Sequence, residues 1–162
     1  MRQITKPFLV FSLLALVFSC SVEEDNDTVE YQNVRVSYNT IDIEILEILN
    51  EYRLSKGLSS LSFLDEASEE AIKHNQYMIS NEEVSHDYFG QRCQNINAKI
   101  TTTKIGENVG YGFSGAANVV NAWLNSPGHK ALIEDAEFSK VGISSLKDDE
   151  GKYYFTNIFI GI

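Results

Sequence analysis

The stretch from Asn121 to Ile133 constrains the fold most, because it contains the single tryptophan of the chain and one of its two prolines. Apolar residues recur at helical spacing before the proline, which predicts a helix from about Ala116 to Asn125. Pro127 cannot continue that helix but suits the first position of a new one. Ser126 before it is a preferred N-cap, and we expect its hydroxyl to accept from free backbone amides. The stretch therefore predicts two helices that meet at a corner.

His129 falls in the first turn of the second of these helices. The positive end of a helix dipole disfavours imidazolium there, so we expect a neutral ring with a nitrogen lone pair available. Such a ring suits a metal ligand or a base, but a histidine at a helix start, taken alone, is more often a structural hydrogen-bonder. Which role His129 has depends on the residues that lie near it in the fold.

The rest of the chain predicts helices first and a hairpin last. Apolar residues at helical spacing indicate amphipathic helices over about 39–55 and 65–79 and a short helix around 92–98. β-branched and aromatic residues are enriched over 138–146 and 152–160, on either side of a turn rich in Asp and Gly. This order predicts an α+β fold in which a small antiparallel sheet is covered by helices.

Polar residues in the middle of the chain add further candidates. His74 lies on the inner side of the second predicted helix and reads as a half-buried structural histidine whose hydrogen bonds are made. His86 lies in the mostly irregular segment 81–104, where a histidine is ordinarily solvated. Glu107 stands among glycines in 106–112, where the backbone can approach other groups closely.

The N-terminus predicts export. Arg2 and Lys6 precede an apolar run over 8–18, which is too short to span a bilayer and reads as the core of a secretion signal. The run ends in a sequence that resembles a bacterial lipobox, so we expect a lipoprotein signal peptide over 1–19 and acylation of Cys20. A plain signal peptide cleaved nearby is the alternative.

The segment after the lipobox is acidic and has little to bury, so 20–38 is predicted to be the lipidated cysteine and a flexible tether, and 39–162 the folded domain. Acidic residues in this position resemble the surface-export signals of some Gram-negative lipoproteins. We therefore expect a lipoprotein of the bacterial cell envelope, with exposure at the outer surface as a hypothesis. If Cys20 carries lipid, Cys93 is alone and no internal disulfide forms; we expect Cys93 to be buried as a small apolar residue.

Charge excludes one class of partner. The net charge of −10 and the pI near 4.7 argue against binding to a nucleic-acid backbone, since no basic run is present to neutralise phosphates.

Four short motifs in order resemble the CAP superfamily of cysteine-rich secretory proteins, insect venom antigens and plant pathogenesis-related proteins, the SCP-like domains. The motifs are Leu49-Asn50-Glu51-Tyr52-Arg53, Ser85-His86, Gly106-Glu107-Asn108, and Ala122-Trp123 followed by Ser126-Pro127-Gly128-His129. The resemblance spans about Ile41 to Ile160 and is greatest to the short bacterial branch that lacks disulfides.

The resemblance implies an α-β-α sandwich with a central cleft, which in several members holds a divalent metal between two histidines and two acidic residues. His86 and His129 take the histidine places and Glu107 one acidic place, while the second acidic place is Ser126 here. The implied ligand-binding cleft is His86, Glu107, Ser126 and His129, and the implied ligands of zinc or another divalent metal are His86, Glu107 and His129. Two neutral imidazoles and one carboxylate match an open zinc site.

Three functions follow as hypotheses. The leading one is a non-enzymatic binding module, held at the membrane through a lipid anchor on Cys20, that binds an envelope or extracellular macromolecule. The second is a hydrolase of peptide or cell-wall material, either metal-assisted or based on Ser126, His129 and Glu107. The third, permitted by the resemblance alone, is a lipid- or sterol-binding protein. No residue is assigned a catalytic role in the leading hypothesis.

Overall fold

The structure is a computed structural model that describes residues 36–162. The predicted signal peptide, the lipidation of Cys20 and most of the predicted tether lie outside the described residues. Within the described part, no helix combines the length and the apolar character needed to cross a membrane.

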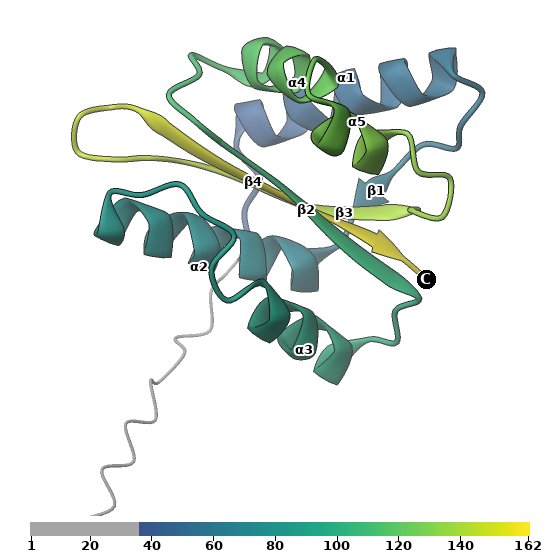
Figure 1. Cartoon of the computed structure of the whole chain (residues 1–162), viewed down its shortest axis with the longest axis horizontal. Coiled ribbons are helices and arrows are strands. Elements are labelled where there is room, and N and C mark those ends of the chain that lie inside the picture. The colour runs from purple at the N-terminus through teal and green to yellow at the C-terminus, as the bar shows by residue number, and fades with distance from the viewer. Residues whose placement is uncertain (1–35) are drawn as a thin grey trace, which may run out of the picture. The chain divides into compact units, whose positions relative to one another are not determined.

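A four-stranded mixed sheet forms the middle layer (Figure 1). Its strands are β1 (Ser62–Phe63), β2 (Lys104–Tyr111), β3 (Lys140–Lys147) and β4 (Tyr153–Gly161), in the order β1-β3-β4-β2. β4 pairs antiparallel with β2 on one side and with β3 on the other. The short β1 pairs parallel with β3, so the sheet is not wholly antiparallel as the sequence had suggested.

Helices cover both faces of this sheet. One face carries α1 (Thr40–Ser55), α4 (Ala116–Leu124) and α5 (Pro127–Ile133), and the other carries α2 (Asp65–Asn81) and α3 (Phe89–Lys99). The α-β-α sandwich and the corner between α4 and α5 are therefore confirmed. The predicted helices and the terminal hairpin also appear within a few residues of the expected bounds, with α3 longer than expected.

β2 was not predicted, and its composition explains why. It contains two glycines, a residue that is depleted in strands. A Cβ at Gly106 would come within 2.8 Å of the Leu132 side chain, and one at Gly110 within 2.8 Å of the Val119 side chain. The glycines let α5 and α4 approach the strand closely, so they serve helix packing rather than a turn.

Arg53 fixes the end of α5. It is fully buried, and its guanidinium donates to the carbonyls of Ser59, Ile133, Asp135 and Phe138 at 2.7 to 3.0 Å. Ile133 closes α5, where helix carbonyls have no partner within the helix. The guanidinium thereby ties α1 to the end of α5 and to the connection that leads into β3.

Candidate functional site

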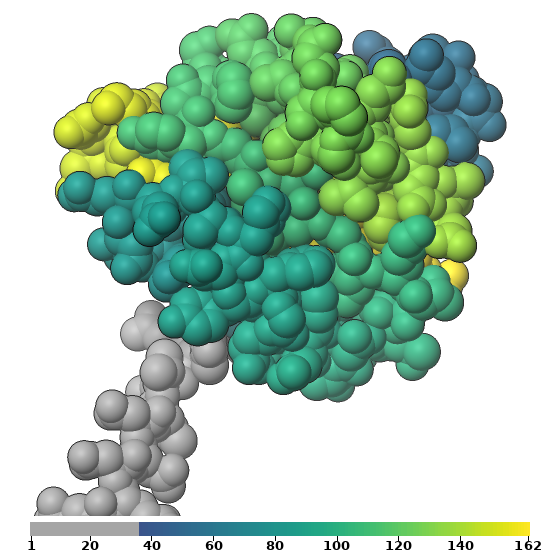
Figure 2. All heavy atoms as spheres, in the orientation of Figure 1, coloured from purple at the N-terminus to yellow at the C-terminus, as the bar shows by residue number. Residues whose placement is uncertain are grey.

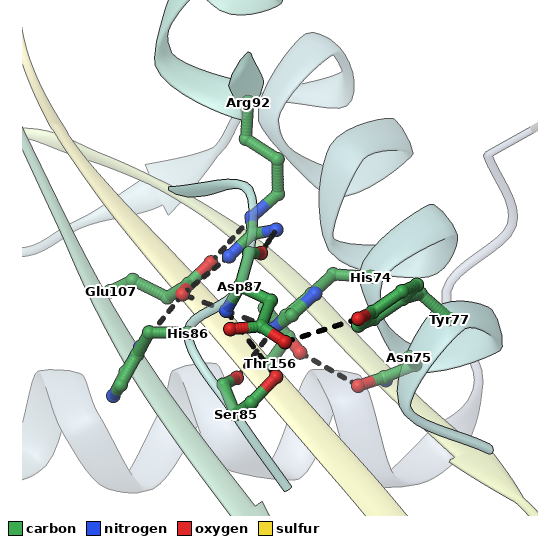
Figure 3. Close-up of polar contacts among 9 residues, drawn as sticks. All are labelled: His74, Asn75, Tyr77, Ser85, His86, Asp87, Arg92, Glu107 and Thr156. Atoms are coloured by element: carbon green, nitrogen blue, oxygen red, sulfur yellow. Dashed lines mark hydrogen bonds and ion pairs between the residues drawn. The ribbon is translucent and has the colours of Figure 1, made fainter. Parts of the chain in front are cut away.

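Glu107 lies on β2 with its carboxylate buried on the α2–α3 side of the sheet, and its side chain is only 1% exposed (Figure 3). Arg92 on α3 donates from Nε to Oε2 and from Nη2 to Oε1, both at 2.7 Å. Such a two-pronged, charge-assisted contact is strong and fixes the plane of the carboxylate. Burial opposes ionisation, but the hydrogen bonds from His86 and Arg92 outweigh it and lower the pKa of Glu107, so the group stays a carboxylate.

His86 contacts the same carboxylate from the solvent side. Its Nδ1 lies 2.8 Å from Glu107 Oε1, while its side chain is 52% exposed. Because a carboxylate only accepts hydrogen bonds, Nδ1 carries the proton, and in the neutral ring Nε2 keeps its lone pair. Figure 3 shows Nε2 directed away from Glu107. The carboxylate therefore sets both the orientation and the tautomer of an exposed imidazole.

The main chain on either side of His86 is also held. His74 Nε2 lies 2.8 Å from the Ser85 carbonyl, and Arg92 Nη1 donates to the Asp87 carbonyl at 2.6 Å. The Tyr77 hydroxyl donates to the Asp87 carboxylate at 3.1 Å. Arg92 thus positions His86 twice, through Glu107 and through the backbone.

His74 is more buried than expected, at 2% exposed, and its Nδ1 has no hydrogen-bond partner among the described residues. The expectation that its hydrogen bonds would all be made was wrong. Burial and the charge of Arg92 lower the pKa of His74, which keeps the ring neutral. Because the Ser85 carbonyl only accepts, the proton is on Nε2, and His74 acts on the site by holding that carbonyl.

His129 lies in the first turn of α5 and is partly exposed. Burial lowers its pKa, and the charge of His86 lowers it further; this is the direction expected for a neutral ring, but with these causes in place of the helix dipole. The Asn108 amide donates to its main-chain carbonyl at 3.1 Å. None of the described residues hydrogen-bonds to its ring, which leaves the imidazole nitrogens available to a ligand.

Ser126 occupies the N-cap of α5 as predicted, but its side chain makes no capping hydrogen bond, so that part of the prediction was wrong. Its main chain carries the local contacts: its N–H donates to Trp123 and its carbonyl accepts from Lys130. No hydrogen bond joins the Ser126 hydroxyl to a histidine among the described residues. The site therefore lacks the contact between nucleophile and base that serine catalysis requires.

The implied metal set needs a different arrangement of Glu107. Within residues 36–162, no group of three or more His, Cys, Asp and Glu side chains is placed to hold a metal ion. Both carboxylate oxygens of Glu107 already face the Arg92 guanidinium, so a cation there would meet a fixed positive charge. The residues as arranged do not fit a three-ligand centre, while the His86 and His129 nitrogens are the donors that remain.

One positioning residue, Arg92, was missed from the sequence, because it belongs to no motif and its partner Glu107 lies on another element. His74 was identified as a structural histidine, but its contact with the Ser85 carbonyl was not predicted. Arg92 had one usable signal: it stands four residues before Ile96, which is fully buried on the same face of α3. An arginine on the apolar face of a helix indicates a buried charge partner.

Comparison with known families gives one match over most of the chain. Residues 46–159 match the model of the family described as CAP, Cysteine-rich secretory protein family. Two relatives from Bacillus subtilis (strain 168) are similar in sequence. The uncharacterized membrane protein YlbC is 26% identical over 121 residues, which are 73% of this chain and 34% of YlbC. The uncharacterized protein YkwD is 27% identical over 128 residues, 77% of this chain and 49% of YkwD. The chain thus spans less than half the length of either relative.

Solved structures share the fold. An outer surface protein from Borrelia burgdorferi superposes with a TM-score of 0.68 at 26% identity, covering 77% of this chain and 96% of that protein. An extracellular protein containing a SCP domain from Bacillus anthracis str. Ames gives 0.66 at 26% identity, covering 74% of this chain and 40% of that protein. The hookworm platelet inhibitor, at 13% identity and a TM-score of 0.53, covers 81% of this chain and 74% of that protein and shares the fold alone.

Proposed function

The chain belongs to the CAP, cysteine-rich secretory protein, family, and we propose that it is a non-enzymatic binding module that acts at the cell envelope. Its similarity to an outer surface protein and to an extracellular SCP-domain protein supports a location outside the cytoplasm. The proposal includes an anchor: the lipobox-like sequence ending at Cys20 holds the domain at a membrane through lipid.

The observation that carries the proposal is the fixed, exposed imidazole of His86. Its Nδ1 is held by a buried carboxylate that is itself held by Arg92, and its Nε2 is left to a ligand. A side chain locked before binding loses little conformational entropy when the ligand arrives. His129 on α5 supplies a second imidazole whose nitrogens have no partner among the described residues. Two imidazoles with ring nitrogens free for hydrogen bonds can recognise polar groups without performing chemistry on them.

The serine-based hydrolase is the weaker alternative on this geometry. Ser126 has no base in hydrogen-bond contact, and the Glu107 carboxylate orients His86 rather than His129. A triad needs its acid, base and nucleophile in one chain of contacts.

A capture experiment tests the binding role. The full chain, His86→Ala, His129→Ala and the remote turn variant Lys152→Ala are immobilised and incubated with envelope extract. We expect one macromolecule to be retained by wild type and Lys152→Ala and lost from both histidine variants. Equal retention by all four proteins would contradict the proposal.

Metal binding is a second candidate, favoured by the contact between His86 Nδ1 and Glu107. A carboxylate that holds the far nitrogen of a histidine is the usual outer partner of a metal-bound imidazole. In this version His86 and His129 are the ligands and Glu107 orients one of them. Zinc calorimetry on the full chain should then show binding that is lost in His86→Ala and His129→Ala and weakened about 10- to 100-fold in Glu107→Gln. Binding unaffected by the histidine variants would remove this candidate.

A further inference from the structure

β2 is the outermost strand on its side of the sheet, so half of its main-chain groups point away from β4. The register pairs Tyr111 with Tyr154, and the ladder continues as the Gly112 N–H donates to the Tyr153 carbonyl at 2.9 Å. In an antiparallel pair, such hydrogen-bonded positions alternate along the strand. Even-numbered residues of β2 therefore bond to β4, and odd-numbered residues direct both N–H and C=O outward.

A contact at Val109 confirms this direction. The Trp123 indole N–H donates to the Val109 carbonyl at 2.9 Å, and the indole comes from α4, not from β4. Ile105 and Glu107 are the next outward residues along β2. Among residues 36–162, no hydrogen bond reaches their outward N–H or C=O groups. We call the outward main chain of Ile105 and Glu107 the open edge.

Solvent reaches the open edge. Glu107 as a whole residue is 7% exposed, whereas its side chain is 1% exposed, so what is exposed of this residue is mainly its backbone. Figure 2 shows this side of the molecule hollowed between the α4–α5 layer and the α3 layer, with atoms of β2 visible between them. His86 lies beside the open edge through its contact with Glu107.

We propose that the open edge binds an extended polypeptide segment of a partner protein by β-strand addition, with His86 and His129 contacting that segment from the two helical layers. Donor and acceptor groups on every second residue, about 7 Å apart, match the repeat of an extended peptide. The indole on Val109 ends the open edge, so the guest strand pairs over about three residues. This inference rests on the proposed function in taking the surface around His86 as the binding site.

A proline at residue 105 tests the edge directly. Proline lacks an N–H, and at an outward position it removes no bond to β4. Ile105→Ala is the matched control, because it loses the same packing of the Ile105 side chain but keeps the N–H. Random heptapeptides displayed on phage are panned on the full chain. We expect enriched peptides that bind wild type and Ile105→Ala, and that bind Ile105→Pro about tenfold more weakly.

N-methylation of the enriched peptide, one residue at a time, gives a second readout on wild type alone. Only alternate amides of a guest strand face the host, so methylation should abolish binding at every second residue and be tolerated between them. This arm keeps the test valid if Ile105→Pro fails to fold, as thermal unfolding would reveal. Failure to enrich any peptide, equal binding to Ile105→Pro once folded, or equal sensitivity at all positions would overturn the inference.

The same variants separate this inference from the proposed function. If the envelope partner is lost from His86→Ala and His129→Ala but retained by a folded Ile105→Pro, the binding role stands and the strand addition is wrong. If peptides bind the edge but neither histidine variant loses the envelope partner, the proposed function is wrong.

Discussion

The two edges of the sheet differ in how their outward main-chain groups are hydrogen-bonded. At the β3 edge, β1 pairs with the start of β3. Farther along β3, side chains make the hydrogen bonds: the Ile143 N–H donates to the Ser68 hydroxyl at 3.2 Å, and the Asn39 amide donates to the Ser145 carbonyl at 3.0 Å. At the β2 edge, the Val109 carbonyl is the only outward main-chain group of β2 with a hydrogen bond from residues 36–162, donated by the Trp123 indole. The first edge is buried by the protein itself at Ile143 and Ser145, and the second is open at Ile105 and Glu107.

The difference between the two edges is what supports the proposed binding role of the β2 backbone. Proteins ordinarily cover or block sheet edges, because an exposed edge pairs with other chains. Here Ile143 and Ser145, on the side away from His86, are buried and each carries a side-chain hydrogen bond, whereas the outward groups of Ile105 and Glu107 beside His86 have none among the described residues. An uncovered stretch of edge beside a fixed, exposed imidazole is the feature on which the proposed strand addition rests.

The largest expected effect comes from releasing the structure beside the open edge. Arg92→Ala leaves the Glu107 carboxylate buried without its partner and frees the Asp87 carbonyl. Breaking a buried ion pair from one side costs about 3–5 kcal/mol, so urea denaturation should show a fall of that size in the free energy of unfolding. Lys99→Ala, which removes an exposed contact to Glu69, is the control and should lose at most about 1 kcal/mol. Equal losses would show that the cluster is not what holds this side of the fold.

Opening the closed edge should have the next largest effect. Ser68→Ala removes the acceptor of the Ile143 N–H in a fully buried setting. An orphaned buried donor costs about 1–3 kcal/mol, measured again by urea denaturation. Ser55→Ala is a matched exposed change on α1 and should stay within about 0.5 kcal/mol of wild type. If the two variants match, covering that edge contributes nothing to stability.

Extending the open edge should have a smaller effect. Trp123→Phe keeps an aromatic ring in the core but removes the donor to the Val109 carbonyl. We expect a loss of about 1 kcal/mol, together with binding of the enriched peptides that is as tight as or tighter than in wild type, because one more acceptor becomes available to a guest strand. Peptide binding lost in a folded Trp123→Phe would contradict this view of the indole as the end of the open edge.

Mild acid should have the smallest effect. The folded pKa of His74 is lowered by burial and by Arg92, with Glu107 and His86 also facing the ring. Its contribution is therefore present above its unfolded pKa, near 6.5, and is lost as the pH falls below that value. Between pH 7 and pH 6 the free energy of unfolding should fall by less than about 1 kcal/mol. A second fall follows below about 4.5, since the pKa of Glu107 is also lowered. The lowered pKa of His129 adds to the same first fall, so His74→Gln should reduce the first fall and keep the second, and His74→Gln with His129→Gln should remove the first. An unchanged first fall in His74→Gln would assign it to other groups.

Local sequence patterns were sufficient to predict most of the helices and the terminal hairpin. The apolar spacing around Trp123 and the proline after it were sufficient to predict the α4–α5 corner, because a helix and its boundary depend on neighbouring residues. The strand β2 was not predicted because its two glycines make sense only through their close approach to Leu132 and Val119, which lie on other elements. Without that strand, its open edge could not be predicted either.

For the candidate site, too, local motifs predicted some features and contacts between distant elements determined the rest. His86, Glu107 and His129 were identified through short motifs, but their roles depend on contacts that no motif contains. Arg92 on α3 binds the Glu107 carboxylate on β2, which the resemblance had implied as a metal ligand. Cys93, expected to be buried, is only partly so, since it lies beside rather than on the inner face of α3.

Amide hydrogen exchange of the ligand-free full chain tests the open edge most directly. The Gly106 and Asn108 amides bond to β4, whereas the intervening Glu107 amide and the preceding Ile105 amide point outward. We predict slow exchange at Gly106 and Asn108 and exchange many times faster at Ile105 and Glu107, within one continuous strand. Uniform protection along β2 would contradict the account, because the edge would then be closed.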